Sequence, residues 1–281
     1  MKHIIILSII ALFVSACSSG GASDADVNYR DTVTVAVTPT LDCLPLFVAQ
    51  ETGIADSMQC LLRLQTHNAY ADCDTAIIGR SADAAFSDNV RSEALRTAFA
   101  QKQAKRKRKD TLCIFPHDNL QLYMFTNVKA RIKEAKQLTD KMVACDRKSS
   151  EAVLARQVLD SVGLKDDKTF IVEMLNVNTR VKMINANIMD AIIVPEPQAS
   201  IVRSNGHKEI VKATTVNGKK PGCLVTRRNT RLITDIYNRA CDSINKNGIH
   251  HYDSILIKRL AIPKENVKNV ADCKLKKITA K

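Results

Sequence analysis

Aromatic side chains are scarce in this sequence, and tryptophan is absent. Phe, Trp and Tyr make up 4% of the 281 residues, as seven Phe and five Tyr. Pockets that enclose a flat ligand between several rings depend on many aromatic side chains. The scarcity argues against a binding pocket built as a large aromatic box, although single rings remain available at Tyr70, Phe86 and Phe115.

The local signatures of common enzyme and metal sites are also missing. The sequence has no G-x-S-x-G, H-E-x-x-H or Walker pattern, so none of the site geometries that those motifs build is indicated. No Cys and His residues have the spacing of a structural zinc site. Only His250 and His251 are adjacent among the six histidines. We therefore expect no catalytic residues, no metal and no cofactor.

Negative charge is in deficit. The chain has 42 Lys and Arg residues against 29 Asp and Glu, a formal net charge of +13. Such a charge suits nucleic acid, an anionic membrane surface or an anionic small ligand. The densest basic run, at residues 102–109, has no nucleic-acid-binding module beside it, so nucleic acid is not an expected partner. We interpret the run as a solvated helix end that suits the helix macrodipole, with contact to anionic lipid or a membrane partner as the alternative.

The one long apolar run lies at the start of the chain. Residues 4–14 are apolar except for Ser8, and they follow Lys2 and His3. A membrane-spanning helix needs about 20 apolar residues, whereas the core of a signal peptide has about 7–15. The run therefore has the length of a signal-peptide core, and no later stretch is apolar enough to cross a bilayer.

The run ends in VSAC at residues 14–17, which resembles the lipobox of bacterial lipoproteins, whose cysteine is acylated and becomes the new N-terminus. The resemblance implies a signal peptide over residues 1–16, a lipid on Cys17, and attachment to a membrane of the cell envelope on its periplasmic side. Residues 17–30 are rich in Ser, Gly, Ala and Asp, which is typical of a flexible tether. The alternative is a buried N-terminal hydrophobic segment with an incidental cysteine.

Cysteine is unusually frequent, with nine residues. An even number remains when Cys17 is set aside, and an exported protein can form disulfides between them. Several lie inside apolar runs, where a small buried thiol is the simpler interpretation. Both alternatives stay open, and no pairing is predicted among Cys43, Cys60, Cys73, Cys113, Cys145, Cys223, Cys241 and Cys273.

From residue 31 onward, short runs typical of strands alternate with stretches typical of amphipathic helices. TVTVAV at residues 32–37 is β-branched and ends at a Thr-Pro-Thr turn. Residues 149–162 have the apolar spacing of a helix, with Gly163 at its end, and a helix is also expected over residues 128–138. The alternation predicts an α/β fold of open, largely parallel sheets with helices on both faces.

In such sheets, ligands bind in the crevice beyond the carboxyl ends of the strands. The segments that directly follow predicted strands are therefore candidate binding segments. Most of them lead into a helix N-terminus, where backbone N–H groups can hold an anion or a polar ligand edge. The candidate ligand-binding residues selected from them are Thr38, Thr40, Asp42, Ser87, Asp88, Asn89, Ser149, Arg180 and Glu196.

Each candidate also has a structural interpretation. Asp88, Asn89 and Ser149, like Ser150 beside it, could simply cap a helix. Arg180 could bind an anion through two hydrogen bonds or form a salt bridge on a helix surface. The Glu196 carboxylate could accept hydrogen bonds from an amino or amidine-like group, or favour the start of a helix in its Pro-Glu-Pro turn.

Three segments together resemble the extracytoplasmic solute-binding proteins of ABC transporters, in the group that handles sulfonates, nitrate and thiamine-precursor pyrimidines. They are LPLFVAQETGI at residues 44–54, SADAAFS at 81–87 and RVKMINANIMDAIIVPEPQAS at 180–200. The third is the most specific, because an Arg-led helix, a D-A-x-x-x-P-E-P strand end and a further helix follow in order. The correspondence runs in register over about residues 32–206.

The resemblance implies a two-lobed periplasmic-binding-protein fold of type II, with two open sheets flanked by helices and a ligand cleft between the lobes. Lobe 1 is expected at residues 31–123 and 216–281, and lobe 2 at 124–215. The implied function is capture of a small molecule, such as a sulfonate, nitrate or a pyrimidine-like compound, for delivery to an ABC permease. An enzyme on the same fold, of the thiamine-pyrimidine or menaquinone-synthesis type, and a structural or adhesion lipoprotein are the alternatives.

The lipobox interpretation makes a direct prediction. Radiolabelled palmitate should enter the protein when it is expressed in a bacterium that processes lipoproteins, and the Cys17→Ala variant should carry no label. Equal labelling of the variant and the unaltered protein, or no labelling of either, would contradict a lipid on Cys17.

Overall fold

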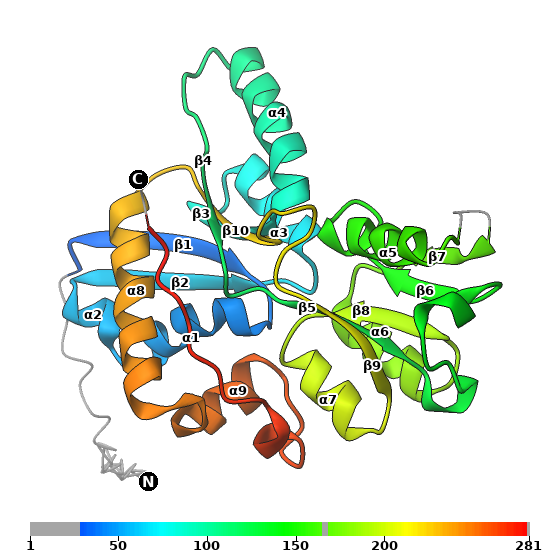
Figure 1. The fold of residues 1–281 in the computed structure, drawn as a ribbon. Helices are drawn as coiled ribbons and strands as arrows, with labels where there is room; N and C mark the ends of the chain where they lie inside the picture. Colours follow the sequence, from blue (N-terminus) through cyan, green and yellow to red (C-terminus); the bar gives the residue numbers. More distant parts are fainter. Residues whose placement is uncertain (1–28, 165–167, 280–281) are drawn as a thin grey trace, which may run out of the picture.

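The computed structural model describes residues 29–164 and 168–279. The expected signal peptide, the lipidated Cys17 and nearly all of the expected tether lie outside the described residues. The described chain forms two sheets, each with helices on both of its faces (Figure 1). This two-lobed α/β arrangement confirms the fold class expected from the sequence.

The first sheet has the strand order β2-β1-β3-β10-β4. Strands β1, β2 and β3 are mutually parallel, and β10 runs antiparallel to its neighbours β3 and β4. The bounds of the five strands are Asp31–Val37 for β1, Cys60–Thr66 for β2, Ala84–Asp88 for β3, Cys113–His117 for β4 and Gly222–Thr226 for β10.

The second sheet repeats this pattern, with the order β7-β6-β8-β5-β9. Strands β6, β7 and β8 are parallel, and β5 runs antiparallel to β8 and β9. The bounds are Leu122–Thr126 for β5, Met142–Cys145 for β6, Phe170–Glu173 for β7, Ala191–Val194 for β8 and Lys208–Ala213 for β9.

The expectation of largely parallel sheets is therefore wrong for two of the strands, β5 and β10. Each is the first strand after the chain passes from one sheet to the other, at residues 118–121 and 214–221. Each passage reaches the new sheet on the side that faces the cleft, which is where the parallel strands of that sheet end. The first strand after the passage therefore runs antiparallel to them. We infer that the lobes divide at these two passages, which Figure 1 shows between β4 and β5 and between β9 and β10.

Residues alternate between the two faces of a strand with a period of two, and this places helices on both faces of each sheet. Val33, Val35 and Val37 of β1 pack in one core with α1 and α8, whereas Ala36 packs on the opposite face with α3 and α4. The bounds of these and the remaining helices are Leu44–Glu51 for α1, Ile54–Ser57 for α2, Tyr70–Gly79 for α3, Asn89–Lys105 for α4, Ser150–Ser161 for α5, Val177–Asn185 for α6, Gln198–Ser204 for α7, Thr230–Asn247 for α8 and Asp253–Arg259 for α9.

The helix expected over residues 128–138 is not formed. Two short 3-10 turns, Val128–Ala130 and Ala135–Leu138, replace it. Arg131 between them has φ 55°, a left-handed conformation that a continuous helix does not accommodate. The buried side chains of Ile132 and Leu138 still pack against α5. The apolar spacing here therefore results from burial of these side chains and not from a helix.

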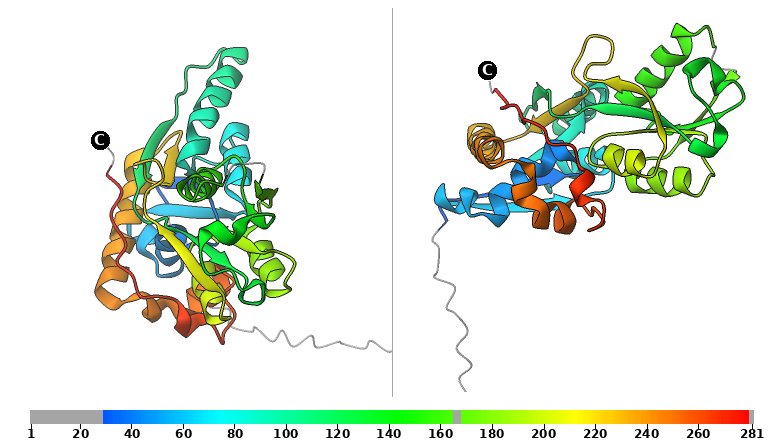
Figure 2. Two further views of the ribbon diagram at one scale, coloured as in Figure 1. Left: turned by 45° about the vertical axis from the view of Figure 1, so that its right-hand side comes forward. Right: turned by 60° about the horizontal axis from the view of Figure 1, so that its bottom comes forward.

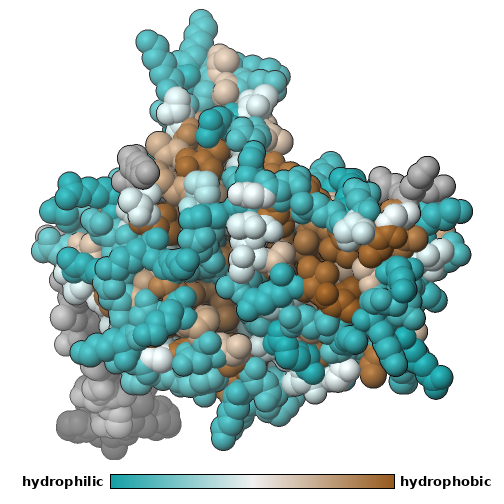
Figure 3. Space-filling view, in the orientation of Figure 1, coloured by the Kyte–Doolittle hydropathy of each residue, from teal (hydrophilic) through white to brown (hydrophobic). Residues whose placement is uncertain are grey.

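Helix α4 and the segment that leads from it to β4 project from the body of the first lobe (Figures 1 and 2). The basic run lies at the end of this projection, and residues 104–109 are exposed. Lys102 and Lys105 lie in the last turn of α4, as the helix-end interpretation expects. Figure 3 shows hydrophilic residues over most of one face of the molecule. Among the described residues, no helix has the length and apolar character needed to cross a membrane.

The eight described cysteines are all unpaired, and only Cys113 is exposed. Cys273 is partly exposed, and burial raises its thiol pKa to about 11. The other six are buried. The buried-thiol interpretation therefore holds for most of these cysteines.

Accessibility predicts their reactivity, since the thiolate is the reactive form and must be reached by the reagent. Brief treatment of the folded protein with iodoacetamide, followed by peptide mass mapping, should modify Cys113 first and Cys273 more slowly. The six buried cysteines should react only after unfolding. Pairs of cysteines linked by disulfides in the mapped peptides, or modification of Cys43 or Cys223 as fast as Cys113, would contradict this structure.

Candidate functional site

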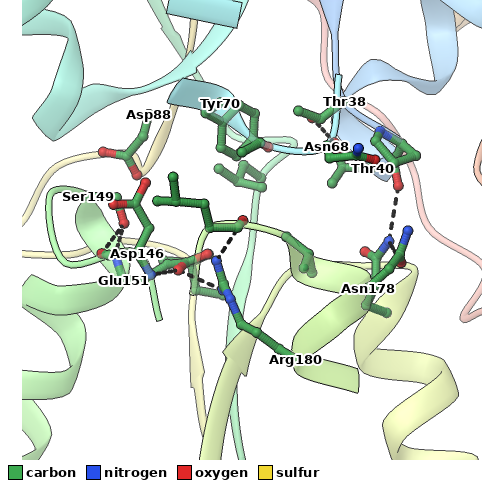
Figure 4. Close-up of a pocket in the computed structure, with 17 residues that line it drawn as sticks. Thr38, Thr40, Asn68, Tyr70, Asp88, Asp146, Ser149, Glu151, Asn178 and Arg180 are labelled. Atoms are coloured by element: carbon green, nitrogen blue, oxygen red, sulfur yellow. Dashed lines mark hydrogen bonds and ion pairs between the residues drawn. The ribbon is translucent and has the colours of Figure 1, made fainter. Parts of the chain in front are cut away.

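A cavity lies between the two lobes, where the carboxyl ends of the parallel strands face each other (Figure 4). The segment after β1, the end of β3 and the start of α3 line it from the first lobe. The segment after β6 and the first turns of α5, α6 and α7 line it from the second. The lining residues are Thr38, Pro39, Thr40, Asn68, Ala69, Tyr70, Asp88, Leu120, Leu122, Asp146, Ser149, Glu151, Leu175, Val177, Asn178, Arg180 and Gln198.

The cavity is narrow. Its volume is about 20 Å³, which is room for about one water molecule. The arrangement of the lobes is therefore a closed one, and a ligand larger than a few atoms can enter only if the lobes move apart.

Five of the nine predicted site residues line this cavity, and four do not. Those that line it are Thr38, Thr40, Asp88, Ser149 and Arg180. Two of the segments selected because they follow a strand also supply polar lining residues that were not singled out. These residues are Asp146 and Asn178.

The hydroxyl groups of Thr38 and Thr40 lie 2.8 Å apart after β1. Asp42 lies behind them, fully buried, where its carboxylate accepts hydrogen bonds from the Tyr70 hydroxyl at 3.3 Å. Burial raises the pKa of Asp42 to about 6. Asp42 therefore does not line the cavity, but it positions Tyr70, which does.

Ser87, Asn89 and Glu196 have local structural roles. The Ser87 hydroxyl donates to Asp74 at 2.6 Å, and Asn89 is the first residue of α4. The Glu196 carboxylate accepts hydrogen bonds from the N–H and hydroxyl groups of Ser200 at 3.0 and 2.7 Å, in the first turns of α7. These hydrogen bonds are those expected if Glu196 stabilises the start of a helix.

Arg180 lies at the floor of the cavity, and its charge is already paired. Its side chain is 1% exposed and forms a 2.7 Å ion pair with Glu151. Its other N–H groups donate to the carbonyl oxygens of Met174, Leu175 and Ile193. The salt-bridge interpretation applies, but the bridge is buried and not on a helix surface, so Arg180 fixes the start of α6 against α5 and β8.

Asp88 joins the lobes. It ends β3 and caps α4, where its Oδ1 accepts a hydrogen bond from the Val90 N–H group at 2.8 Å. Both carboxylate oxygens also accept from the N–H group of Ser150 at 3.0 Å, and the Ser150 hydroxyl donates to Oδ1 at 3.1 Å. The residue is 2% exposed. Burial outweighs these hydrogen bonds and raises the pKa of Asp88 to about 7.

A second interaction between the lobes runs beside Asp88. Arg91 of α4 donates from Nε to Asp74 at 2.8 Å within the first lobe. Its terminal nitrogen reaches Asp146 of the second lobe at 3.2 Å. Two residues of the first lobe thus contact the second lobe. Arg91 binds the segment after β6, and Asp88 binds the first turn of α5.

The opposite end of the cavity is closed by α7. The side-chain N–H groups of Gln198 donate to the Pro39 carbonyl at 3.1 Å and to Asn178 at 3.2 Å. The Leu41 N–H group donates to the carbonyl of Glu196 at 3.0 Å. The sequence named Tyr70 only as an available ring, and it did not single out Gln198, Glu151 or Asn68, because their positions in the site depend on how the two lobes meet.

The charged groups that line the cavity are three carboxylates, Asp88, Asp146 and Glu151, and one guanidinium, Arg180. The described residues contain no group of three His, Cys, Asp or Glu side chains that could hold a metal ion. The site therefore presents hydrogen-bond acceptors with local negative charge, although the whole chain is basic.

No protein-family model matches this chain, and no curated protein matches it. The fold is similar to that of the alkanesulfonate-binding protein SsuA of Xanthomonas axonopodis pv. citri bound to MOPS, at 13% identity and a TM-score of 0.65 over 86% of this chain and 83% of that one. The ligand-binding component of an ABC-type import system from Staphylococcus aureus, with zinc bound, is similar at 13% identity and a TM-score of 0.66, over 90% and 87% of the two chains.

The periplasmic nitrate-binding protein NrtA of Synechocystis is similar at 15% identity and a TM-score of 0.66, over 84% of this chain and 68% of that one. These proteins come from the group that the three sequence segments resemble. At such low identity, the likeness establishes the periplasmic-binding-protein fold and leaves the ligand to be argued from the cavity itself.

The raised pKa of Asp88 predicts a pH-dependent stability difference. A carboxyl group with a folded pKa near 7 and an unfolded value near 3.9 destabilises the folded state increasingly as pH rises from 4 to 7. Asn at this position still caps a helix and carries no charge. The free energy of unfolding of Asp88→Asn should therefore rise relative to that of the unaltered protein, by about 2–3 kcal/mol between pH 5 and pH 8.

Urea unfolding at both pH values measures this difference. The variant must be compared with the unaltered protein because His117 also makes stability depend on pH, in the opposite direction. Burial lowers the pKa of His117 to about 3 in the folded protein. This contribution is the same in both proteins and cancels in the difference between their free energies of unfolding. A difference that stays constant from pH 5 to pH 8 would show that Asp88 is already ionised at pH 5.

Proposed function

We propose that this protein is an extracytoplasmic solute-binding protein, which captures a small molecule between its lobes and delivers it to an ABC permease. The observation that carries the proposal is the cavity, which is lined by polar side chains from both lobes at the carboxyl ends of their parallel strands. That edge is where open α/β sheets bind ligands. The structural neighbours that bind an alkanesulfonate and nitrate, and the component of an ABC-type import system, support it.

Capture would proceed by hinge motion of the lobes. Two chain passages connect them, at residues 118–121 and 214–221, and hinges of this kind absorb domain closure in a few residues. The closed form is held by Asp88 with Ser150, Arg91 with Asp146 and Gln198 with Pro39. A ligand that contacts both lobes shifts the population from open forms toward a form closed around the ligand.

The lipid expected on Cys17 would give this capture a location. A protein tethered to the membrane that holds its permease has a high effective concentration near that partner. The tether and the lipid together would place the receptor in the cell envelope on the periplasmic side, and we propose no turnover of the captured solute.

A thermal-shift experiment tests the proposal. A panel that contains taurine, nitrate, aminopyrimidines, amidines and amines should include a compound that raises the melting temperature in a saturable way. Stabilisation by a ligand follows its concentration relative to the dissociation constant, about 2.7 kcal/mol at a hundredfold excess. The Tyr70→Ala variant, altered in the cavity wall, should lose the shift.

Lys105→Ala serves as the matched control, because Lys105 is exposed at the end of α4 and far from the lining residues. It should keep the full shift. Mass spectrometry of the bound compound after incubation should recover it unchanged. Loss of the compound with formation of a product would identify an enzyme, and the absence of a shift with every compound would overturn the proposal.

A further inference from the structure

One position in the cavity that suits an anion, the start of α5, is already filled by the chain itself. The N-terminus of a long helix attracts negative charge through its free N–H groups and its dipole. Asp88 lies at two such ends, as the cap of α4 and as the acceptor for the Ser150 N–H group at the start of α5. A nitrate or sulfonate group at the start of α5 would have to displace this buried carboxylate.

The cations near the cavity are occupied as well. Arg180 is paired with Glu151, and Arg91 is shared between Asp74 and Asp146. An incoming anion would compete with carboxylates that are covalently fixed in place. It would also lie close to Asp88 and Asp146, and like charges at such range are repulsive in a desolvated site.

One residue that lines the same cavity carries an unsatisfied acceptor. Gln198 is 1% exposed, and its side-chain Oε1 is buried without a hydrogen-bond partner. The Pro39 carbonyl can only accept, so the Gln198 nitrogen that bonds to it at 3.1 Å is correctly assigned and the opposite atom is the oxygen. A buried acceptor with no partner costs about 1–3 kcal/mol, which a donor group on a ligand would recover.

Figure 4 shows how these groups are arranged. Asp88, Asp146, Ser149 and Glu151 gather at one end of the cavity, Thr38, Thr40, Asn68 and Asn178 at the other, and Tyr70 lies between them. Carboxylates at one end accept hydrogen bonds, and the hydroxyl and amide groups at the other end can accept them as well as donate them. With a ring in the middle, this arrangement suits a short solute with donor groups at its two ends and an apolar or flat centre.

From this geometry we infer that the cavity selects a small neutral or cationic solute that donates hydrogen bonds, of the amine, amidine or amino-heterocycle class, and excludes nitrate and sulfonates. The inference rests on the proposed solute-binding function and names its ligand class. Gln198 Oε1 accepts from one donor group, and the carboxylate end of the cavity accepts from another. Asp88 is the residue that excludes anions.

Calorimetric titration of the full-length protein tests both halves. Benzamidine, acetamidine and 4-aminopyrimidine serve as donor probes, and sodium nitrate and sodium ethanesulfonate as anionic probes. At least one donor probe should bind, and neither anionic probe should bind at 10-fold higher concentration. Gln198→Leu should weaken donor binding by about tenfold or more, because the acceptor is lost. Gln101→Leu, the same change at an exposed position of α4 that does not line the cavity, should change it by less than about threefold.

Asp88→Ser tests the exclusion of anions independently. Serine still caps α4, so the variant should fold, and circular dichroism checks this. Removal of the carboxylate frees the Ser150 N–H group, so nitrate should bind the variant at least tenfold more tightly than it binds the unaltered protein.

The outcomes separate the two proposals. Tight binding of nitrate or ethanesulfonate to the unaltered protein overturns the ligand class and leaves the solute-binding function standing. No gain of nitrate binding in a folded Asp88→Ser variant overturns the role of Asp88. No binding of any donor or anionic probe counts against the function itself, together with the ligand class that depends on it.

Discussion

The position of the two lobes depends on one buried carboxylate. Asp88 ends a strand of the first lobe, caps α4, and accepts hydrogen bonds from Ser150 at the start of α5 in the second. A buried charge is tolerated only while donors surround it. Separation of the lobes strips those donors from Asp88 and, at the same time, breaks the contact of Arg91 with Asp146. Closure of the lobes therefore occurs together with burial of the Asp88 carboxylate, and the geometry of the cavity depends on this closure.

Net charge and local charge point in opposite directions in this protein. The chain carries +13 overall, yet the cavity is lined by Asp88, Asp146 and Glu151 against Arg180 alone. Much of the positive charge is exposed, as in the basic residues at the end of α4. Salt screens exposed charges beyond about 8 Å at physiological ionic strength, so a bound solute responds mainly to the groups that touch it.

Sequence patterns predicted many of the strands and helices because each parallel strand and its helix form a local unit. Ser149 caps α5, Gly163 follows its end with φ 72°, and β8 occupies Ala191–Val194 in the expected Asp-Ala segment. The pattern failed over residues 128–138, where burial of Ile132 produced helix-like spacing without a helix. It also missed the antiparallel β5 and β10, since strand direction depends on where the chain enters a sheet and not on its residues.

For the candidate site, the sequence by itself determined which strand ends carry polar side chains, and Thr38, Thr40, Asp88, Ser149 and Arg180 do line the cavity. The contacts that some of them make with residues distant in the sequence were decided by the tertiary structure. Arg180 forms an ion pair with Glu151 of its own lobe, and Asp88 accepts hydrogen bonds from Ser150 across the cleft. The side-chain oxygen of Gln198 has no hydrogen-bond partner. The physical reason is that a buried charged or polar side chain must pair with a group within hydrogen-bonding distance. Which group lies within that distance depends on how segments far apart in the sequence pack together.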